Sequence, residues 1–335
     1  MRLRGERDLL SGTRGPGRPT RSALAVLAGA TLWGTAGASQ ALLADTFPPA
    51  TVGALRTAVG GLALGALAVV LRRPTTAPAT AATSATAGTV PAAGRAALLL
   101  AGVALVGYQL GFFVGVAALG IAVGTLLAVG SAPFFAGVVA VATGTERPSR
   151  RWTVATGAAV VGLALLIRPD GGTTVDGPGV AAALLAGLSF GTFTVVSKRL
   201  LAGGRRHVDT VAVPFLLAAV AVLPLLAATP AVRDVTTWSD PTTVAVVAWL
   251  GLGATAAGYL LFIVGLRGVP AVVGATLVLM EPLTATLLGV GAFGERLPTT
   301  GAVGALLVAA ALLATAVGAG TSPAGTTPTD PQPAR

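Results

Sequence analysis

The stretch Pro133-Phe134-Phe135, followed by an apolar run and then by Glu146-Arg147, decides the fold because the chain contains this pattern twice. The second copy is Pro282-Leu283-Thr284, again followed by an apolar run and then by Glu295-Arg296. The proline precedes the glutamate by 13 residues in both copies. Each Glu-Arg pair leads into a polar turn and another long apolar run. Repetition of a half-chain made of apolar segments is typical of membrane transporters.

The composition excludes a water-soluble globular protein. Of the 335 residues, 54% are hydrophobic and 10% are charged, and the mean hydropathy is +0.83. Soluble domains carry about a quarter charged residues. The apolar runs are continuous rather than alternating, and backbone groups in lipid must pair within their own segment. The chain is therefore predicted to be an all-α integral membrane protein.

Apolar runs bounded by charge, proline or polar clusters predict ten transmembrane helices, because a span needs about 20 apolar residues. Their ends are defined to about four residues. The predicted spans are 22–43, 49–71, 96–118, 121–143, 152–168, 178–200, 209–228, 244–266, 270–293 and 299–318.

The net charge of +10 orients the chain and does not indicate nucleic-acid binding. With the N-terminus inside, the predicted inside loops hold 18 Lys and Arg residues and the outside loops hold 3. This bias predicts a multi-pass protein of the plasma (inner) membrane with both termini cytoplasmic. A cleaved signal peptide is not expected, because the first apolar run continues to Ala44 and its span has a counterpart in the second half.

The repeat continues outside the opening stretch. Trp33-Gly34-Thr35 in the first span matches Phe190-Gly191-Thr192 in the sixth, and Gly107-Tyr108 in the third matches Gly258-Tyr259 in the eighth. The second and seventh spans do not align. Five spans is an odd number, so the second copy must enter the membrane upside down. Two inverted five-helix repeats, related by a pseudo-two-fold axis in the membrane plane, are predicted.

The predicted organisation has four parts and one flexible loop. Composition predicts disorder in the basic N-terminus and the C-terminal tail, and flexibility in a Pro/Thr/Ala-rich loop of the first repeat. The parts are the N-terminus 1–21, the first repeat 22–168 with the loop 74–94, the second repeat 178–318, and the tail 319–335.

The second half closely resembles EamA-type transporters of the drug/metabolite transporter superfamily. The resemblance rests on Gly258-Tyr259, Gly265-Leu266-Arg267, Met280-Glu281-Pro282, Gly294-Glu295-Arg296-Leu297 and Gly301, with first-half counterparts at Trp33-Gly34-Thr35, Arg56, Pro133 and Glu146-Arg147. It implies ten helices around a central substrate cavity, in a family whose members commonly export amino acids, other metabolites or toxic compounds. One departure is Ala132-Pro133 where the second half has Glu281-Pro282.

Glu281 is the first candidate for a substrate-binding or coupling residue. It lies near the middle of the ninth span with no other charge within ten residues. An isolated carboxylate in hydrocarbon is costly, so it should face a cavity or be protonated, which suits a proton carrier. A glutamic acid hydrogen-bonded to a neighbouring carbonyl is the structural alternative. On one continuous helix Glu281 would share a face with Gly274 and Ala285.

Five further residues within spans are candidates for contact with a substrate. The Arg56 guanidinium could hold an anionic group, or it could extend to the membrane surface. Aromatic and amide side chains suit an amphipathic solute, although Trp and Tyr also anchor helices at membrane interfaces. These further candidates are Arg56, Trp33, Tyr108, Gln109 and Tyr259.

Two motifs are assigned structural roles. Pro133 and Pro282 each remove a helical hydrogen bond and favour a kink, as a hinge or a fixed bend. Glu146-Arg147 and Glu295-Arg296 are expected to cap or pair with neighbouring loop groups.

The leading hypothesis is a secondary-active exporter of small metabolites or drugs, with no cofactor or metal and with a small-molecule substrate and the lipid bilayer as partners. The sequence does not decide whether the protein forms a homodimer. Two alternatives are a membrane enzyme acting on lipid and a non-transporting scaffold. An enzyme should cluster His, Asp or Ser at one face, yet Ser131 and Ser189 have no histidine in any span, and the single histidine, His207, lies in a basic loop. A scaffold needs no charge such as Glu281 at mid-membrane.

Overall fold

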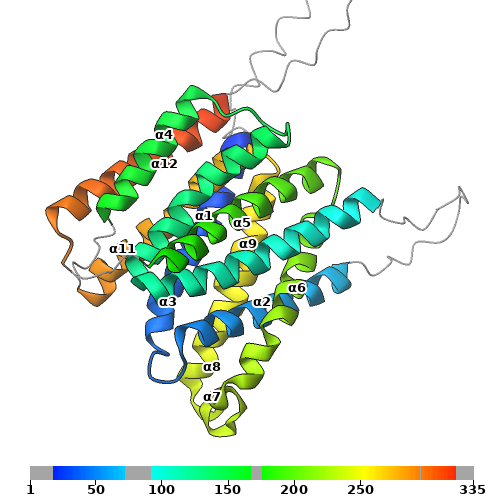
Figure 1. Cartoon of the computed structure of the whole chain (residues 1–335), viewed down its shortest axis with the longest axis vertical. Helices are drawn as coiled ribbons and strands as arrows, with labels where there is room; N and C mark the ends of the chain where they lie inside the picture. The colour runs from blue at the N-terminus through cyan, green and yellow to red at the C-terminus, as the bar shows by residue number, and fades with distance from the viewer. Residues whose placement is uncertain (1–17, 72–91, 167–175, 295, 322–335) are drawn as a thin grey trace, which may run out of the picture.

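The computed structural model describes residues 18–71, 92–166, 176–294 and 296–321. Regular structure within these ranges is entirely helical (Figure 1). Most of the predicted N-terminal segment, of the loop 74–94 and of the tail 319–335 lies outside the described residues, as does Glu295.

Fourteen helical elements follow one another along the described residues. They are α1 (Arg18–Ala41), α2 (Pro49–Leu71), α3 (Ala92–Ala142), α4 (Arg150–Leu166), α5 (Gly177–Ala202), α6 (His207–Ala228), α7 (Pro230–Arg233), η1 (Val235–Ser239), α8 (Pro241–Ala248), η2 (Trp249–Ala257), α9 (Gly258–Leu266), α10 (Ala271–Leu277), α11 (Met280–Phe293) and α12 (Thr299–Thr321).

Eight helical stretches in the described ranges are long and apolar enough to cross a membrane. One of them combines α8, η2 and α9 (Pro241–Leu266), and another covers α10 and most of α11 (Ala271–Ala292). Helices α1 and α4 are not among the eight, and α4 has only 17 residues. The chain is thus an all-helical, multi-pass membrane protein, as its composition predicts.

Two local irregularities have causes in the sequence. In α3 the backbone leaves helical geometry at Gly120, where φ is 79° and ψ is 163°, between the third and fourth predicted spans. Pro133 lies within the same helix. Between α10 and α11, Pro282 has no N–H to donate to the carbonyl of Val278 four residues earlier. That carbonyl accepts instead from the N–H of Glu281, at 2.9 Å.

The break therefore separates the residues expected to share one continuous helix face. Gly274 lies in α10, whereas Glu281 and Ala285 lie in α11. The shared face of Gly274 and Glu281 required a continuous helix, whereas the kink expected at Pro282 interrupts the helical hydrogen bonding just before Glu281.

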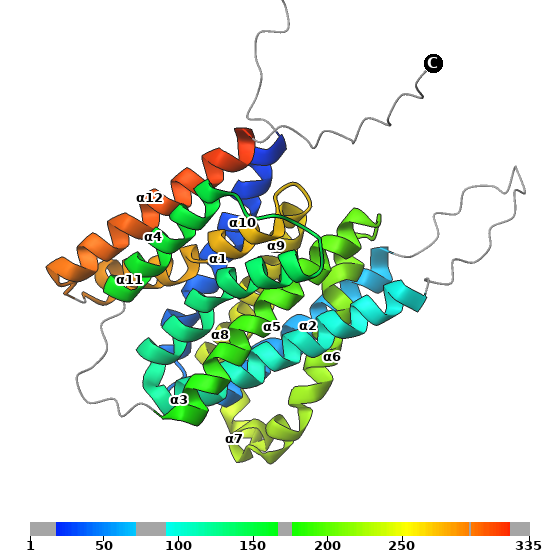
Figure 2. The same cartoon turned by 45° about the horizontal axis from the view of Figure 1, so that its top comes forward.

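The helices pack as pairs from the two halves of the chain. Helix α3 runs along α5, α2 lies against α6, and α4 lies beside α12 (Figures 1 and 2). Helix α1 contacts both α9 and α11. The start of α1 and the end of α12 lie at the same end of the molecule (Figure 2).

Contact between α1 and α9 is close enough to require glycine. A Cβ atom on Gly29 would lie 2.6 Å from the carbonyl oxygen of Gly258 and 3.1 Å from the amide nitrogen of Phe262. On the outer faces, by contrast, large apolar side chains remain exposed, such as Val154 (73%) on α4 and Leu306 (71%) on α12. Small residues inside and apolar residues outside are the pattern of helices that associate in lipid.

Candidate substrate site

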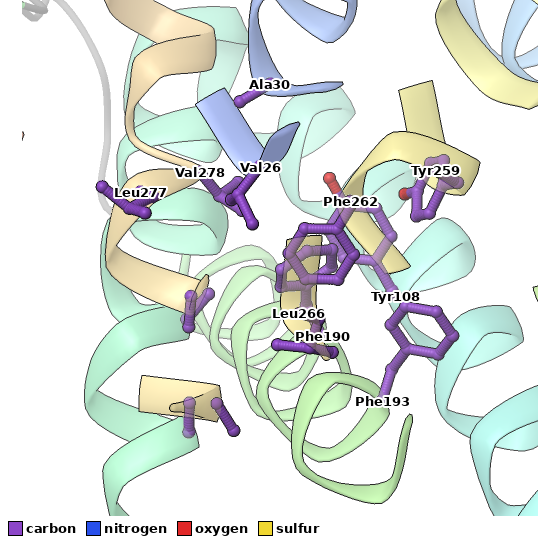
Figure 3. Close-up of a cluster of buried hydrophobic side chains, with 14 of the residues drawn as sticks. Val26, Ala30, Tyr108, Phe190, Phe193, Tyr259, Phe262, Leu266, Leu277 and Val278 are labelled. Atoms are coloured by element: carbon purple, nitrogen blue, oxygen red, sulfur yellow. The ribbon is translucent and has the colours of Figure 1, made fainter. Parts of the chain in front are cut away.

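Three aromatic residues predicted as candidates meet at the centre of the bundle. Trp33 on α1 lies 4.4 Å from Tyr259 on α9 and 6.1 Å from Phe190 on α5, measured between ring centroids. Tyr108 on α3 lies 5.2 Å from Phe190. Trp33, Tyr108 and Tyr259 are all buried. Figure 3 shows Tyr108, Phe190 and Tyr259 gathered in one cluster, contributed by three different helices.

Arg56 and Glu281 bring opposite charges to this cluster. Arg56 lies on α2 and Glu281 on α11, and both are half-buried. The two charges interact electrostatically with each other, and each also interacts with Tyr108 and Tyr259. Both tyrosines are buried inside the bundle, so the two charges lie near its interior. Five candidates, on α1, α2, α3, α9 and α11, thus lie in the same region of the bundle.

The Arg56 guanidinium keeps an unused hydrogen-bond donor. Its Nε atom is buried and has no hydrogen-bond partner among the described residues. A buried donor without a partner is uncommon in proteins and carries a desolvation penalty.

Glu281 has a local reason to tolerate a negative charge. It lies in the first turn of α11, directly after the break that Pro282 produces. Unpaired backbone N–H groups at a helix N-terminus favour a negative charge there. Helix α1 also approaches this turn closely, since a Cβ atom on Gly34 would lie 2.6 Å from the carbonyl oxygen of Glu281.

Gln109 has a structural contact beside the site. It is 5% exposed, and its side-chain amide donates a hydrogen bond to the hydroxyl of Thr57. Thr57 in turn donates to the carbonyl oxygen of Gly53, at 2.8 Å. Thr57 directly follows Arg56, so this bond fixes the position of Arg56 on α2 relative to α3.

Sequence reasoning missed Thr57 and the phenylalanines that line the aromatic cluster. Thr57 carried a signal, since it is a polar residue adjacent to a charge within a span. Phe190 also carried one, as the repeat counterpart of Trp33. Phe215 lies 4.5 Å from Tyr259, and Phe262 lies 5.5 Å from Trp33, between ring centroids. These two resemble any other apolar residue of a span in the sequence.

A separate apolar cavity of about 560 Å³ lies between α1, α11 and α12. It includes Met280, the neighbour of Glu281, but none of the six candidate residues. Its lining is Thr20, Ala23, Leu24, Leu27, Met280, Leu283, Ala309, Leu312, Leu313, Ala316 and Val317. This lining is almost entirely apolar.

A multi-pass helical protein that holds opposite charges and aromatic side chains within its bundle has the features of a membrane transporter. The family model of the EamA-like transporter family matches residues 20–168 and again residues 177–317. The chain belongs to the EamA-like transporter family.

Two comparisons agree with this assignment. The chain is 38% identical over 285 residues to the "Uncharacterized transporter YwfM" of Bacillus subtilis (strain 168), which covers 85% of this chain and 90% of that protein. A solved structure titled "Crystal structure of protein" superposes with a TM-score of 0.69 at 18% identity, covering 89% of this chain and 97% of the other. The second similarity concerns the fold alone.

Proposed function

We propose that this protein is a secondary-active transporter of the plasma membrane that exports small, amino-acid-like metabolites or drugs by alternating access. The observation that carries the proposal is the pair of opposite charges, Arg56 and Glu281, beside the buried Tyr108 and Tyr259. A guanidinium binds carboxylates through paired hydrogen bonds, and a carboxylate can hold an ammonium group. Together the two charges are complementary to a zwitterion.

The architecture proposed for this function is ten transmembrane helices in two inverted five-helix repeats, 22–168 and 178–318, with both termini cytoplasmic. Contacts between the repeats support it, because equivalent residues make equivalent contacts. Trp33 packs on Tyr259, at 4.4 Å, and their sequence counterparts Phe190 and Tyr108 pack on each other, at 5.2 Å, between ring centroids.

Close approaches between backbones are also equivalent in the two repeats. A Cβ atom on Gly34 would lie 2.6 Å from the carbonyl oxygen of Glu281, and one on Gly191 would lie 3.2 Å from that of Ala132. Gly191 is the counterpart of Gly34, and Ala132 is the counterpart of Glu281. Two such matched pairs support a pseudo-two-fold axis through the aromatic cluster, and such symmetry lets one scaffold open to either side.

The two halves of the site differ chemically at one position. Glu281 carries a carboxylate where Ala132 carries a methyl group, so only one repeat supplies an acid next to the shared site. We therefore propose that Glu281 is the residue that couples transport to protons and that Arg56 contacts the solute.

The test is transport in proteoliposomes across a panel of metabolites, with and without a pH gradient. We expect Glu281→Gln to fold and to lose flux driven by the pH gradient, because the amide cannot exchange a proton. Asp45→Asn is the matched control, since Asp45 is an exposed carboxylate in the loop between α1 and α2. Gradient-driven flux that is equal in Glu281→Gln and in the unmodified protein would remove Glu281 as a coupling group.

A further inference from the structure

The turn between α9 and α10 is held from two sides by charged residues of other segments. This turn, residues 267–270, connects the helix that carries Tyr259 to the broken helix that carries Glu281. A movement of the turn therefore moves two elements of the candidate site together.

Glu146 caps the start of α10 from the other half of the chain. Its Oε1 accepts a hydrogen bond from the N–H of Ala271, at 2.7 Å, and its Oε2 accepts one from the N–H of Val272, at 3.2 Å. The N-cap residue of α10 is Pro270, whose side chain makes no capping hydrogen bond. The carboxylate thus supplies the cap that the local sequence cannot provide. The capping role expected for Glu146 is confirmed.

Lys198 caps the end of α9 on the other side of the same turn. Its ammonium donates to three carbonyl oxygens, those of Leu266 at 3.0 Å, Arg267 at 3.0 Å and Val269 at 2.7 Å. A cation is favoured at a helix C-terminus, where carbonyl groups lack helical partners. Lys198 and Glu146 also interact electrostatically.

The residue type at position 198 fits this geometry. Lys198 is the single lysine among the 22 basic residues of the chain; the others are arginine. An ammonium directs three donors around one point, whereas a guanidinium directs its donors in one plane. Three carbonyl groups that converge on one nitrogen therefore require lysine in a chain that otherwise uses arginine.

Neighbouring contacts tie the same end of the molecule together. Arg199 donates to the carbonyl oxygen of Thr143, which links the end of α5 to the end of α3. Trp152 on α4 donates from Nε1 to the carbonyl oxygen of Val272, at 3.0 Å, and to the hydroxyl of Thr276, at 2.9 Å. The two bonds of Trp152 join the first repeat to α10 in the second.

We propose that Glu146 and Lys198 form a latch that holds the α9–α10 turn and closes the cytoplasmic end of the transport path. The inference rests on the proposed transport function and on the cytoplasmic location that the distribution of basic residues predicts for these loops. Opening toward the cytoplasm requires the turn to leave Glu146, Lys198 or both. The two residues are positioning residues: they set which side the site faces and do not touch the solute.

The experiment measures accessibility at the latch rather than transport. The chain contains no cysteine, so a single Ser197→Cys substitution gives a clean reporter. Ser197 is adjacent to Lys198, is 0% exposed, and its hydroxyl has no hydrogen-bond partner among the described residues. The full-length protein is placed in inside-out vesicles and labelled with a membrane-impermeant maleimide, while flux is measured separately.

We expect Glu146→Gln and Lys198→Met to increase the labelling rate about tenfold, since each removes charge-assisted hydrogen bonds. Lys198→Arg should give a smaller increase, because the charge remains and the three-carbonyl geometry is lost. Glu295→Gln, which alters the other copy of the same sequence motif, is the matched control and should give no increase.

The latch would be overturned if folded, monodisperse Glu146→Gln or Lys198→Arg were labelled at the same rate as the protein that carries Ser197→Cys alone. An unchanged rate in either of the two variants is enough. Increased labelling in the latch variants, together with absence of flux for every solute, would leave the latch in place and remove the transport function. The two outcomes are therefore distinguishable.

Discussion

The side-chain amide of Gln109 on α3 donates a hydrogen bond to the hydroxyl of Thr57 on α2, and both side chains are buried. The bond connects helices that make few other contacts in the described structure. Because Thr57 directly follows Arg56, the same bond fixes the backbone of α2 at Arg56 relative to α3. A polar contact between two helices thus sets the position of the backbone that carries Arg56.

Removal of the Thr57 hydroxyl alone should destabilise the protein more than removal of both partners of this bond. Gln109→Leu leaves the Thr57 hydroxyl its bond to Gly53, whereas Thr57→Val leaves the Gln109 amide buried and unpaired, which costs about 1–3 kcal/mol. We expect the double variant to recover part of that loss in thermal unfolding in detergent. Thr57→Ser, which keeps the hydroxyl, is the control. Strictly additive losses would contradict the coupling.

Substitution of Arg56 should select against charged solutes. Arg56→Ala removes the donor that faces the site, so we expect the KM for anionic or zwitterionic solutes to rise about 10- to 100-fold, the range of a charge-assisted hydrogen bond. Arg56→Lys should recover part of the affinity, because the charge remains without the paired donors. Equal kinetics for the unmodified protein and Arg56→Ala would count against a binding role.

The positions of the helices could be predicted from the sequence because lipid imposes a simple requirement on length and hydropathy. The second predicted span, 49–71, has the same ends as α2. The third and fourth predicted spans, 96–118 and 121–143, both lie in α3 and are separated by the break at Gly120. The break before Glu281 could also be anticipated at Pro282. The π-helix η2 (Trp249–Ala257) could not, since its residues resemble those of any apolar span.

The candidate residues could be predicted as a set, but their partners could not. Charges and amides within apolar spans are rare, so Arg56, Gln109 and Glu281 stand out. Which helices bring them together depends on packing between distant segments. The sequence repeat identified Trp33 and Phe190, and likewise Tyr108 and Tyr259, as equivalent positions, but it did not indicate which of these residues are in contact. The three-carbonyl site of Lys198 depends on the path of a turn about 70 residues away, as the sequence separations of 68 to 71 show.

Asp240 should make the stability of the loop before α8 dependent on pH. Its carboxylate accepts hydrogen bonds from the N–H of Thr243, at 2.9 Å, from the Thr243 hydroxyl, at 2.8 Å, and from the N–H of Thr242, at 3.1 Å. These bonds, chiefly those from Thr243, hold the pKa of Asp240 below its ordinary value of 3.8.

A carboxyl whose pKa is depressed in the folded state stabilises that state above its unfolded pKa and loses this contribution as the pH falls through the folded pKa. Asp240→Ala should therefore lower the melting temperature at neutral pH, and the difference from the unmodified protein should narrow as the pH falls below 3.8. Asp240→Asn keeps one acceptor oxygen and should lie between the two. A difference in melting temperature that is constant across this range would contradict the charged cap.

The inverted repeat requires the two Glu-Arg motifs to lie on opposite sides of the membrane. Single cysteines at Thr145, beside the first motif, and at Thr300, at the start of α12, provide the test in a cysteine-free chain. We expect an impermeant reagent to label Thr145→Cys from the cytoplasmic side and Thr300→Cys from the opposite side. Labelling of both from one side would exclude the inverted architecture and, with it, the proposed mechanism of alternating access.

The close approach of α1 to α9 should make Gly29 intolerant of substitution. An alanine methyl group there would lie 2.6 Å from the carbonyl oxygen of Gly258 and 3.1 Å from the nitrogen of Phe262, and both are backbone atoms of α9 that cannot rotate away. Gly29→Ala should lower the free energy of unfolding by about 1–3 kcal/mol and should separate Trp33 from Tyr259.

Gly37 on the same helix is the matched control, because no heavy atom lies within 4 Å of the equivalent position. Gly37→Ala should be neutral or stabilise the protein by up to about 1 kcal/mol, since alanine favours a helix over glycine. Thermal unfolding in detergent measures both variants, and equal losses in the two would mean that helix propensity, and not contact between α1 and α9, governs substitution in this helix.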